Sequence, residues 1–289
     1  MTALVFPIVA ARTADLLLFI DWTSGYSNGG SIYVRAAVVL VIAVFAFCCF
    51  IVRKRMTNGS DENSEAITSG YLERSSFFAG TCLFLAGFAT AAASVGVFYD
   101  MVSGRDLSDI MKNGGELFRA GDGGLYYILL VASAALGIFV AFWFMLVGIW
   151  YFRGEGYFAG GSFISVLVAV WYYTRVIKDF IRNPVNPNNT TALALLFSVL
   201  ILAVFYTKLS KAVSVDILSS EEPLLAGAGA AAFLWVLGIG VPTAVILVNT
   251  RDYIGLLALV ADAFAAVAAL SVVFVRLPVR RTVMVSFVE

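Results

Sequence analysis

The sequence predicts an all-α protein, a polytopic bundle of membrane-spanning helices. Hydrophobic residues make up 61% of the 289 residues, charged residues make up only 13%, and the mean hydropathy is +0.92. Soluble domains have about 45–50% apolar and about 25% charged residues. A soluble fold could not keep so much apolar surface away from water, whereas a helical bundle in lipid needs no polar exterior.

Seven apolar runs are long enough to cross a bilayer, which takes about 20 mostly apolar residues per helix. The predicted spans are Ser31–Val52, Ser76–Tyr99, Leu125–Phe152, Gly156–Tyr173, Ala192–Thr207, Leu225–Val248 and Tyr253–Val275. The fifth run is the shortest and can extend at either end. Aromatic residues near the ends of the runs, such as Tyr99, Trp171 and Tyr172, fit an interfacial aromatic belt and fit helix packing equally well.

A further apolar segment, Leu4–Ile20, precedes these spans and is interrupted by Pro7, Arg12 and Asp15. Arg12 and Asp15 are three residues apart, so they can pair on one face of a helix. The segment is either an eighth, shorter span or a helix lying in the membrane interface. We favour an embedded helix.

Positive charge beside the spans predicts their orientation, because basic residues stay on the cytoplasmic side. Basic residues 53–55 follow the first span, and Arg276 and two more arginines follow the last. Both ends are therefore expected to be cytoplasmic, which agrees with seven crossings from Ser31 onward. Three basic residues after the fourth span argue the other way, because this topology places them outside: Arg175, Lys178 and Arg182.

The connecting segments suggest one transmembrane domain over residues 1–289. Arg53–Ser75 is polar and has the composition of a solvated linker. Asp100–Gly124 is acidic and predicted outside, and residues 107–111 there predict a short helix on the membrane surface. Asn183–Asn189 contains two prolines and several asparagines, which is typical of a turn between spans.

Asp262 is the most distinctive polar residue, because it lies near the middle of the last span. An ionisable group at that depth costs a few kcal/mol or more unless it is protonated, paired or facing water. Small residues share its helix face at spacings of three, four and seven: Gly255, Ala258, Ala265, Ala266 and Ala269. Such a face favours close helix packing, so Asp262 should point into the bundle. It is a candidate ion, proton or substrate site; the alternative is a structural carboxyl group bonded to a neighbouring helix.

Arg35, just inside the first long span, is the expected ionic partner of Asp262. On the predicted topology it lies shallower by roughly five residues, or about 7–8 Å, which an extended arginine can reach. The alternative, which we favour, is that the Arg35 side chain extends to the lipid headgroups.

Pro242 predicts a kink in the sixth span, near Gly238, because proline removes a backbone donor and clashes with the preceding turn. Broken helices build ion sites in transporters. Transporters usually carry the break twice, in related halves, and this sequence carries it once. A structural kink is therefore favoured over a transport site.

Three small-residue stretches predict close helix contacts: Ala86–Gly96, Gly154–Gly161 and Gly227–Ala232. The last fits a dinucleotide-binding pattern, but it opens a membrane span and follows no strand, so we interpret it as a packing face.

The chemistry-bearing residues point to no cofactor. The chain has no histidine, which argues against histidine-ligated haem and most zinc sites. Cys48, Cys49 and Cys82 lie inside apolar runs and are expected to be small buried hydrophobes. Net charge is zero, which gives no indication of a nucleic-acid partner. We predict no catalytic residue, no metal site and no cofactor.

The segment Asp21–Tyr26 resembles a D-x-x-[ST]-G-aromatic signature of uncharacterised multi-pass membrane proteins of Gram-positive anaerobic bacteria. Trp150–Gly154 and Trp171–Tyr173 are similar to the middle of the same proteins. The resemblance implies a bacterial cytoplasmic membrane and an embedded first segment. It implies no activity.

Two functions from different classes follow. The favoured one is a non-enzymatic membrane protein, a sensor, scaffold or accessory subunit, whose small-residue helix faces bind other membrane proteins or a second copy within the bilayer. The alternative is a small-solute or ion transporter or channel that uses Asp262 near the Pro242 kink, which requires access of water or ligand to Asp262. An enzyme ranks third, because no nucleophile motif is present.

Overall fold

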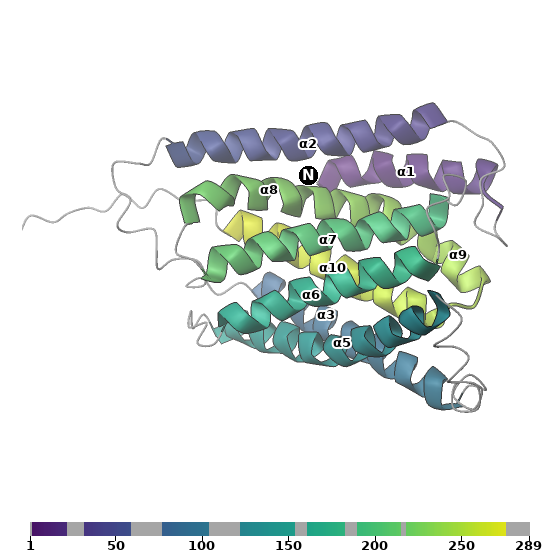
Figure 1. Cartoon of the computed structure of the whole chain (residues 1–289). Helices are drawn as coiled ribbons and strands as arrows, with labels where there is room; N and C mark the ends of the chain where they lie inside the picture. Colours follow the sequence, from purple (N-terminus) through teal and green to yellow (C-terminus); the bar gives the residue numbers. More distant parts are fainter. Residues whose placement is uncertain are drawn as a thin grey trace, which may run out of the picture.

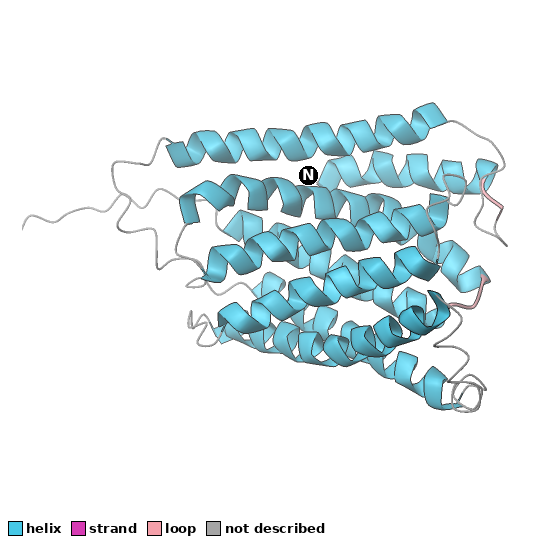
Figure 2. Ribbon diagram, in the orientation of Figure 1, coloured by secondary structure: helices cyan, strands magenta, loops and turns pink. Residues whose placement is uncertain are grey.

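The computed structural model describes residues 2–21, 32–58, 77–103, 122–153, 161–182, 190–214 and 218–275, which are helical almost throughout (Figure 2). The α-helices are α1 (Thr2–Phe19), α2 (Ile32–Asn58), α3 (Phe77–Ser103), α5 (Asp122–Arg153), α6 (Gly161–Arg182), α7 (Thr190–Ser214), α8 (Leu218–Trp235), α9 (Ala244–Asn249) and α10 (Tyr253–Val275). The predictions for residues 22–26, 107–111, 154–160, 183–189 and 276–281 lie outside the described residues.

The long helices lie side by side in one bundle (Figure 1). Helix α2 forms one edge and packs mainly against α8, while α3 and α5 pack against each other at the opposite edge. Between them, α6 contacts α5 and α7, and α10 contacts α3 and α8. This order brings α6 and α10 into the middle of the bundle, although Arg175 of α6 and Asp262 of α10 are 87 positions apart in the chain.

Six helical segments of the described chain are long and apolar enough to cross a membrane, as expected for a membrane protein. They are Arg35–Arg55, Phe77–Met101, Leu125–Ile149, Thr190–Ser210, Pro223–Asn249 and Tyr253–Leu270. They correspond to six of the seven predicted spans, and the last predicted span has the bounds of α10 itself.

The predicted fourth span, Gly156–Tyr173, corresponds to α6 but is not among the six. Its predicted end was wrong, because α6 continues nine residues past Tyr173 to Arg182. The helix continues because apolar residues recur at helical spacing among the charges: Val176, Ile177, Phe180 and Ile181. Arg175 therefore lies within a helix and not in a loop.

Glycines set the closest helix contact, between α3 and α5. A Cβ atom added at Gly80 would lie 2.8 Å from the backbone oxygen of Gly148, and one at Gly87 would lie 2.7 Å from that of Ala141. Both distances are too short for any side chain, so the two backbones touch. The predicted packing role of the Ala86–Gly96 stretch is confirmed, with its partner inside the same chain.

The sixth span departs from α-helical geometry where a kink was predicted. Val236–Gly240 is π-helical and Val241–Thr243 is a 3₁₀ turn, after which α9 completes the span. Pro242 lies in the 3₁₀ turn, because its nitrogen cannot donate to the preceding turn. Helix α1 packs against the π-helical segment through Ile8, whose side chain lies beside Gly238.

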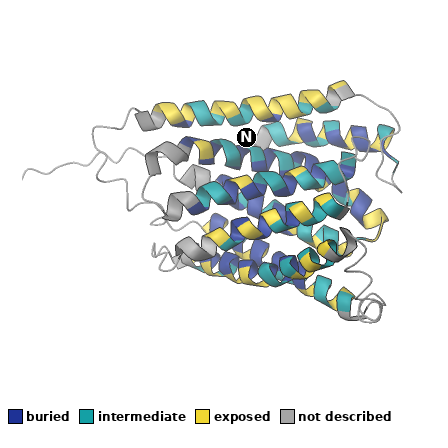
Figure 3. Cartoon of the chain, viewed as in Figure 1, coloured by how far each residue is buried: buried dark blue, intermediate teal, exposed yellow. Residues whose placement is uncertain are grey.

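Burial distinguishes the inner from the outer helices (Figure 3). The expectation that the cysteines are buried holds for Cys82, whereas on α2 Cys48 is exposed and Cys49 is only partly buried. Trp171 and Tyr172 are buried inside the bundle, as the packing interpretation of these rings predicted.

Candidate functional site

Asp262 lies on the inward face of α10, as its small-residue neighbours predicted. Its exposure is only 3%, and Ala265 and Ala266, one turn further along, are fully buried. The alanines bring α10 close to its neighbours and exclude water from the carboxylate. A group in this position needs a strong partner, because its hydration has been lost.

That partner is Arg175 of α6. Arg175 Nη1 donates to Asp262 Oδ1 at 2.6 Å, and Nη2 donates to Oδ2 at 2.8 Å. The two parallel bonds form the bidentate geometry in which a guanidinium and a carboxylate interact most strongly. Both side chains are more than 90% buried.

Aromatic rings surround the guanidinium. Arg175 Cζ lies 4.8 Å from the centroid of the Trp171 ring and 5.6 Å from that of Tyr172, both within the range of cation–π attraction. Trp171 Nε1 donates to the backbone oxygen of Ser133 at 2.9 Å, which ties α6 to α5. The Tyr172 ring stacks on Tyr206 of α7 at 5.3 Å. The arginine is therefore held in one position by contacts from several helices.

A buried pair of this kind holds two helices together without adding much net stability. Its attraction roughly offsets the cost of removing both charges from water. Removing one partner, however, leaves an uncompensated charge, which costs about 3–5 kcal/mol. Arg175 and Asp262 thus join α6 to α10 through their side chains.

A cavity of about 60 Å³ adjoins the arginine. Its polar lining comes from three helices and consists of Thr90, Ser94, Ser133, Arg175 and Lys178, while α10 contributes apolar side chains. Asp262 does not line it. The volume has room for a few water molecules. A solute in this cavity would therefore meet the guanidinium and hydroxyl groups, not the carboxylate.

The predicted pairing of Arg35 with Asp262 is wrong, and Arg35 does not simply extend to the headgroups. Arg35 Nε donates to Asp15 Oδ1 at 2.8 Å, so α2 is joined to α1. Arg12 Nη1 also donates to Asp15, at 2.5 Å, which confirms the predicted pairing of Arg12 with Asp15. Asp15 is much nearer to Arg35 in the sequence than Asp262 is. It also lies on α1, which contacts α2, so Arg35 binds Asp15 and not Asp262.

Pro242 is buried in the 3₁₀ turn that follows the π-helix. Gly240 directly precedes this turn and faces Leu259 of α10. Leu259 lies three residues before Asp262 on the same helix. Thr243 donates its hydroxyl to the backbone oxygen of Gly240, which supplies a bond inside the irregular turn. The segment thus packs against α10 near the ion pair.

Arg175 is the residue that sequence reasoning missed. The predicted end of the fourth span at Tyr173 left Arg175 outside the membrane, whereas α6 continues to Arg182. The helical spacing of apolar residues after Tyr173 was the available signal, together with aromatic residues three and four positions before Arg175. Within the described residues there is no group of three or more cysteine, aspartate or glutamate side chains able to hold a metal ion.

No protein-family model, curated protein or solved structure matches this chain.

Proposed function

We propose that this chain is a non-enzymatic membrane protein, a sensor, scaffold or accessory subunit, that binds other membrane helices through α2. The observation that carries the proposal is the exposure of that helix. Only 6% of the Arg35–Arg55 span is buried, against 39–61% in the other five apolar spans. Among these six spans, α2 therefore has the surface that the rest of the chain covers least.

The contacts of α2 lie on one side. It packs against α8, where a Cβ atom at Gly227 would come within 3.2 Å of the Ala46 backbone oxygen, and it touches α1 near the Arg35–Asp15 bond. Its remaining surface is apolar, with Leu40 63% and Val44 53% exposed. Because helix association in lipid depends on packing and not on apolarity, this face suits a helix from another chain.

The three cysteines offer a direct test by crosslinking in native membranes. A variant that keeps only Cys48, on exposed α2, is compared with one that keeps only the buried Cys82. If a second copy is the partner, Cys48 forms disulfide-linked dimers under mild oxidation and Cys82 does not. If another protein is the partner, Cys48 forms one defined disulfide adduct with that protein. Val44→Trp, on α2, should abolish the adduct, whereas the control Val245→Trp, at a similarly exposed position on α9, should leave it unchanged. A monodisperse monomer without adducts would contradict the proposal.

The proposed topology has seven membrane crossings from α2 onward. Six of them are the apolar spans given above, and α6 is the seventh. Helix α6 has 22 residues, or about 33 Å, enough for a hydrocarbon core of ~30 Å. Its Arg175 is neutralised by Asp262, which lowers the cost of burying it. Helix α1 is an eighth embedded helix, supported by the pairing of its two charges.

The proposed location is a bacterial cytoplasmic membrane, with the end of α2 and the C-terminus on the cytoplasmic side. The basic residues at the end of α2 support this orientation, and the resemblance of Asp21–Tyr26 to membrane proteins of Gram-positive anaerobes supports the membrane.

A second candidate function, a small-solute or ion transporter, is favoured by the cavity beside Arg175. Hydroxyl groups and cations from three helices meet there, next to an ion pair that could open. The test is solute or ion flux into proteoliposomes, with Ser94→Ala expected to change the flux and the matched Ser198→Ala, outside the cavity, to leave it unchanged. Flux equal to that of empty liposomes excludes this candidate.

A further inference from the structure

Arg12 of α1 is a buried arginine whose hydrogen bonding is incomplete. Its side chain is only 7% exposed, and its Nη1 donates to Asp15 at 2.5 Å. Its Nε and Nη2 are also buried, but neither has a hydrogen-bond partner among the described residues. Buried donors without partners cost free energy, and the cost is larger for a charged group. These two donors therefore point to an acceptor from outside the described chain.

The two unpartnered nitrogens form one edge of the Arg12 guanidinium group. The N–H groups of this edge are parallel, so they match two oxygens of one carboxylate or phosphate group. A single acceptor atom, such as the oxygen of a water molecule, satisfies the edge less well because it cannot align with both donors. The shape of the free edge therefore suits an oxyanion.

The charge around Arg12 also favours an anion. Arg12 shares Asp15 with Arg35, whose Nε lies 2.8 and 3.1 Å from the two carboxylate oxygens of Asp15. Among the described residues, the charged groups that act on Arg12 are this one carboxylate and the guanidinium of Arg35. Inside a membrane protein, a charge that is not fully compensated is costly. An anion at the free edge would complete the compensation of Arg12.

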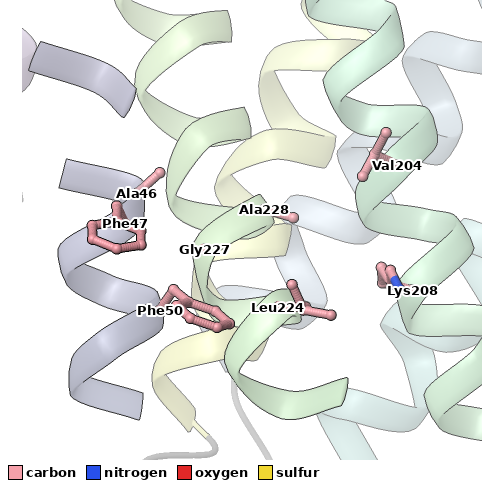
Figure 4. Close-up of a pocket in the computed structure, with 8 residues that line it drawn as sticks. All are labelled: Ala46, Phe47, Phe50, Val204, Lys208, Leu224, Gly227 and Ala228. Atoms are coloured by element: carbon pink, nitrogen blue, oxygen red, sulfur yellow. The ribbon is translucent and has the colours of Figure 1, made fainter. Parts of the chain in front are cut away.

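Three other cations of the bundle do not show this combination of features. Arg175 is held by Asp262 through two hydrogen bonds, and Lys178 lies 3.3 Å from Asp179. Figure 4 shows Lys208 at an apolar groove of about 310 Å³ between α2, α7 and α8, and this lysine is already engaged in an interaction. These cations therefore carry no inference about a ligand.

Contacts along α1 place Arg12 at the irregular part of the sixth span. Ile8 lies beside Gly238 of the π-helical segment, and Leu16 belongs to one buried cluster with Ile246 of α9. The two segments thus run in the same direction. Arg12 follows Ile8 by one helical turn, at the level where α1 contacts the 3₁₀ turn. π-Helical breaks of this kind are frequent at functional sites.

We propose that Arg12 binds one oxyanion, a carboxylate or a phosphate group, between α1 and the irregular part of the sixth span. Nε and Nη2 each donate a hydrogen bond to one oxygen of the anion, while Nη1 keeps its bond to Asp15. Because this edge is buried, the anion enters when α1 shifts away from the 3₁₀ turn. A free anion and the phosphate of a lipid headgroup share this chemistry, and the experiment separates them.

The test follows the arginine Nε–H signals of the ¹⁵N-labelled full-length chain by nuclear magnetic resonance in lipid-free detergent. Sodium acetate or sodium phosphate replaces sodium chloride at constant ionic strength, and the midpoint of thermal unfolding is the second readout. Arg12→Lys keeps the charge but lacks the two-donor edge, and its missing signal identifies Arg12. The matched control, Arg35→Lys, changes the other arginine on Asp15. If Arg12→Lys does not fold, Arg12→Met, which leaves Asp15 paired with Arg35, replaces it.

The Arg12 signal should shift with acetate and with phosphate in the wild type and in Arg35→Lys. Their unfolding midpoints should rise with the anion concentration, because a ligand that binds the folded state stabilises it. Arg12→Lys should weaken the apparent affinity about ten-fold or more, the effect of losing one hydrogen bond to a charged group. Arg12→Met should abolish the response.

The same spectra in phosphatidylcholine nanodiscs identify the source of the anion. A signal already at its bound position without added anion assigns the site to a lipid phosphate, and a shift only on addition of acetate assigns it to a free anion. Either result supports the proposal. An Arg12 signal that moves under none of these conditions overturns it, by leaving water as the acceptor. A midpoint that responds to acetate equally in Arg12→Met and in the wild type also overturns it.

Discussion

Arg175 and Asp262 face each other across the interior of the bundle, joined by two hydrogen bonds of 2.6 and 2.8 Å. A central carboxylate in the last span suggested a transport site, but this geometry uses both of its oxygens to hold a guanidinium. The role the structure supports for Asp262 is therefore to anchor the Arg175 side chain of α6 to α10. The group left for a ligand is the arginine, on the side that lines the cavity.

We expect Asp262→Asn to lower the free energy of unfolding by about 3–5 kcal/mol, because it leaves the Arg175 charge buried without its counter-ion. Unfolding in mixed detergent–denaturant micelles measures the change. The matched control is the double variant Arg175→Met with Asp262→Leu, which replaces the pair with apolar side chains and should recover most of the loss. An Asp262→Asn protein as stable as the wild type would show that the pair does not support the fold.

Replacing Asp15 should lower the free energy of unfolding more than replacing Arg35, one of the two arginines that it binds. Asp15→Asn leaves Arg12 buried beside Arg35 with no carboxylate between them, and a loss of about 3–5 kcal/mol is expected. Arg35→Gln should cost about 1 kcal/mol or less, because the Arg35 side chain is 24% exposed and its bond is partly screened. The same unfolding measurement ranks the variants, and equal losses would contradict this ordering.

The contact between α3 and α5 should not tolerate a methyl group. Gly87→Ala places a Cβ atom 2.7 Å from the Ala141 oxygen, so the helices must separate, at a cost of about 1–3 kcal/mol. Gly96→Ala, on the same helix, meets only the Ile254 side chain at 3.3 Å and is the control. The midpoint of thermal unfolding in detergent should fall for the first variant and stay near the wild-type value for the second.

The docking of α1 on the irregular part of the sixth span depends on Gly238. A Cβ atom there would lie 2.5 Å from Ile8 Cγ2, so Gly238→Ala should destabilise the protein by about 1–3 kcal/mol. Ile8→Ala opens the space that this methyl group needs. The loss of stability in the double variant should therefore be smaller than the sum of the two single losses. The difference should be at least ~0.5 kcal/mol, the size of coupling seen between residues in contact. Additive losses would show that α1 does not pack at this glycine.

Local patterns predicted the helices and the inward side of α10. The bounds of α10, the break near Gly238 and the burial of Asp262 all follow from hydropathy and from helical spacing, which depend only on neighbouring residues. The end of α6 was missed because four charges in its second half lower the hydropathy of that segment, although the helical spacing continues through them.

The partners of the charged residues could not be derived in the same way. Asp262 and Arg175 are 87 positions apart, and Asp15 and Arg35 are 20 apart. A periodic pattern places a side chain on a face and at a depth, but it does not say which helix lies opposite. That choice depends on how closely the backbones approach, as at Gly87 and Ala141, and on the joint packing of all the helices. The sequence alone therefore determines that Asp262 points inward, whereas the tertiary arrangement of the helices decides that the Arg175 side chain of α6 reaches it.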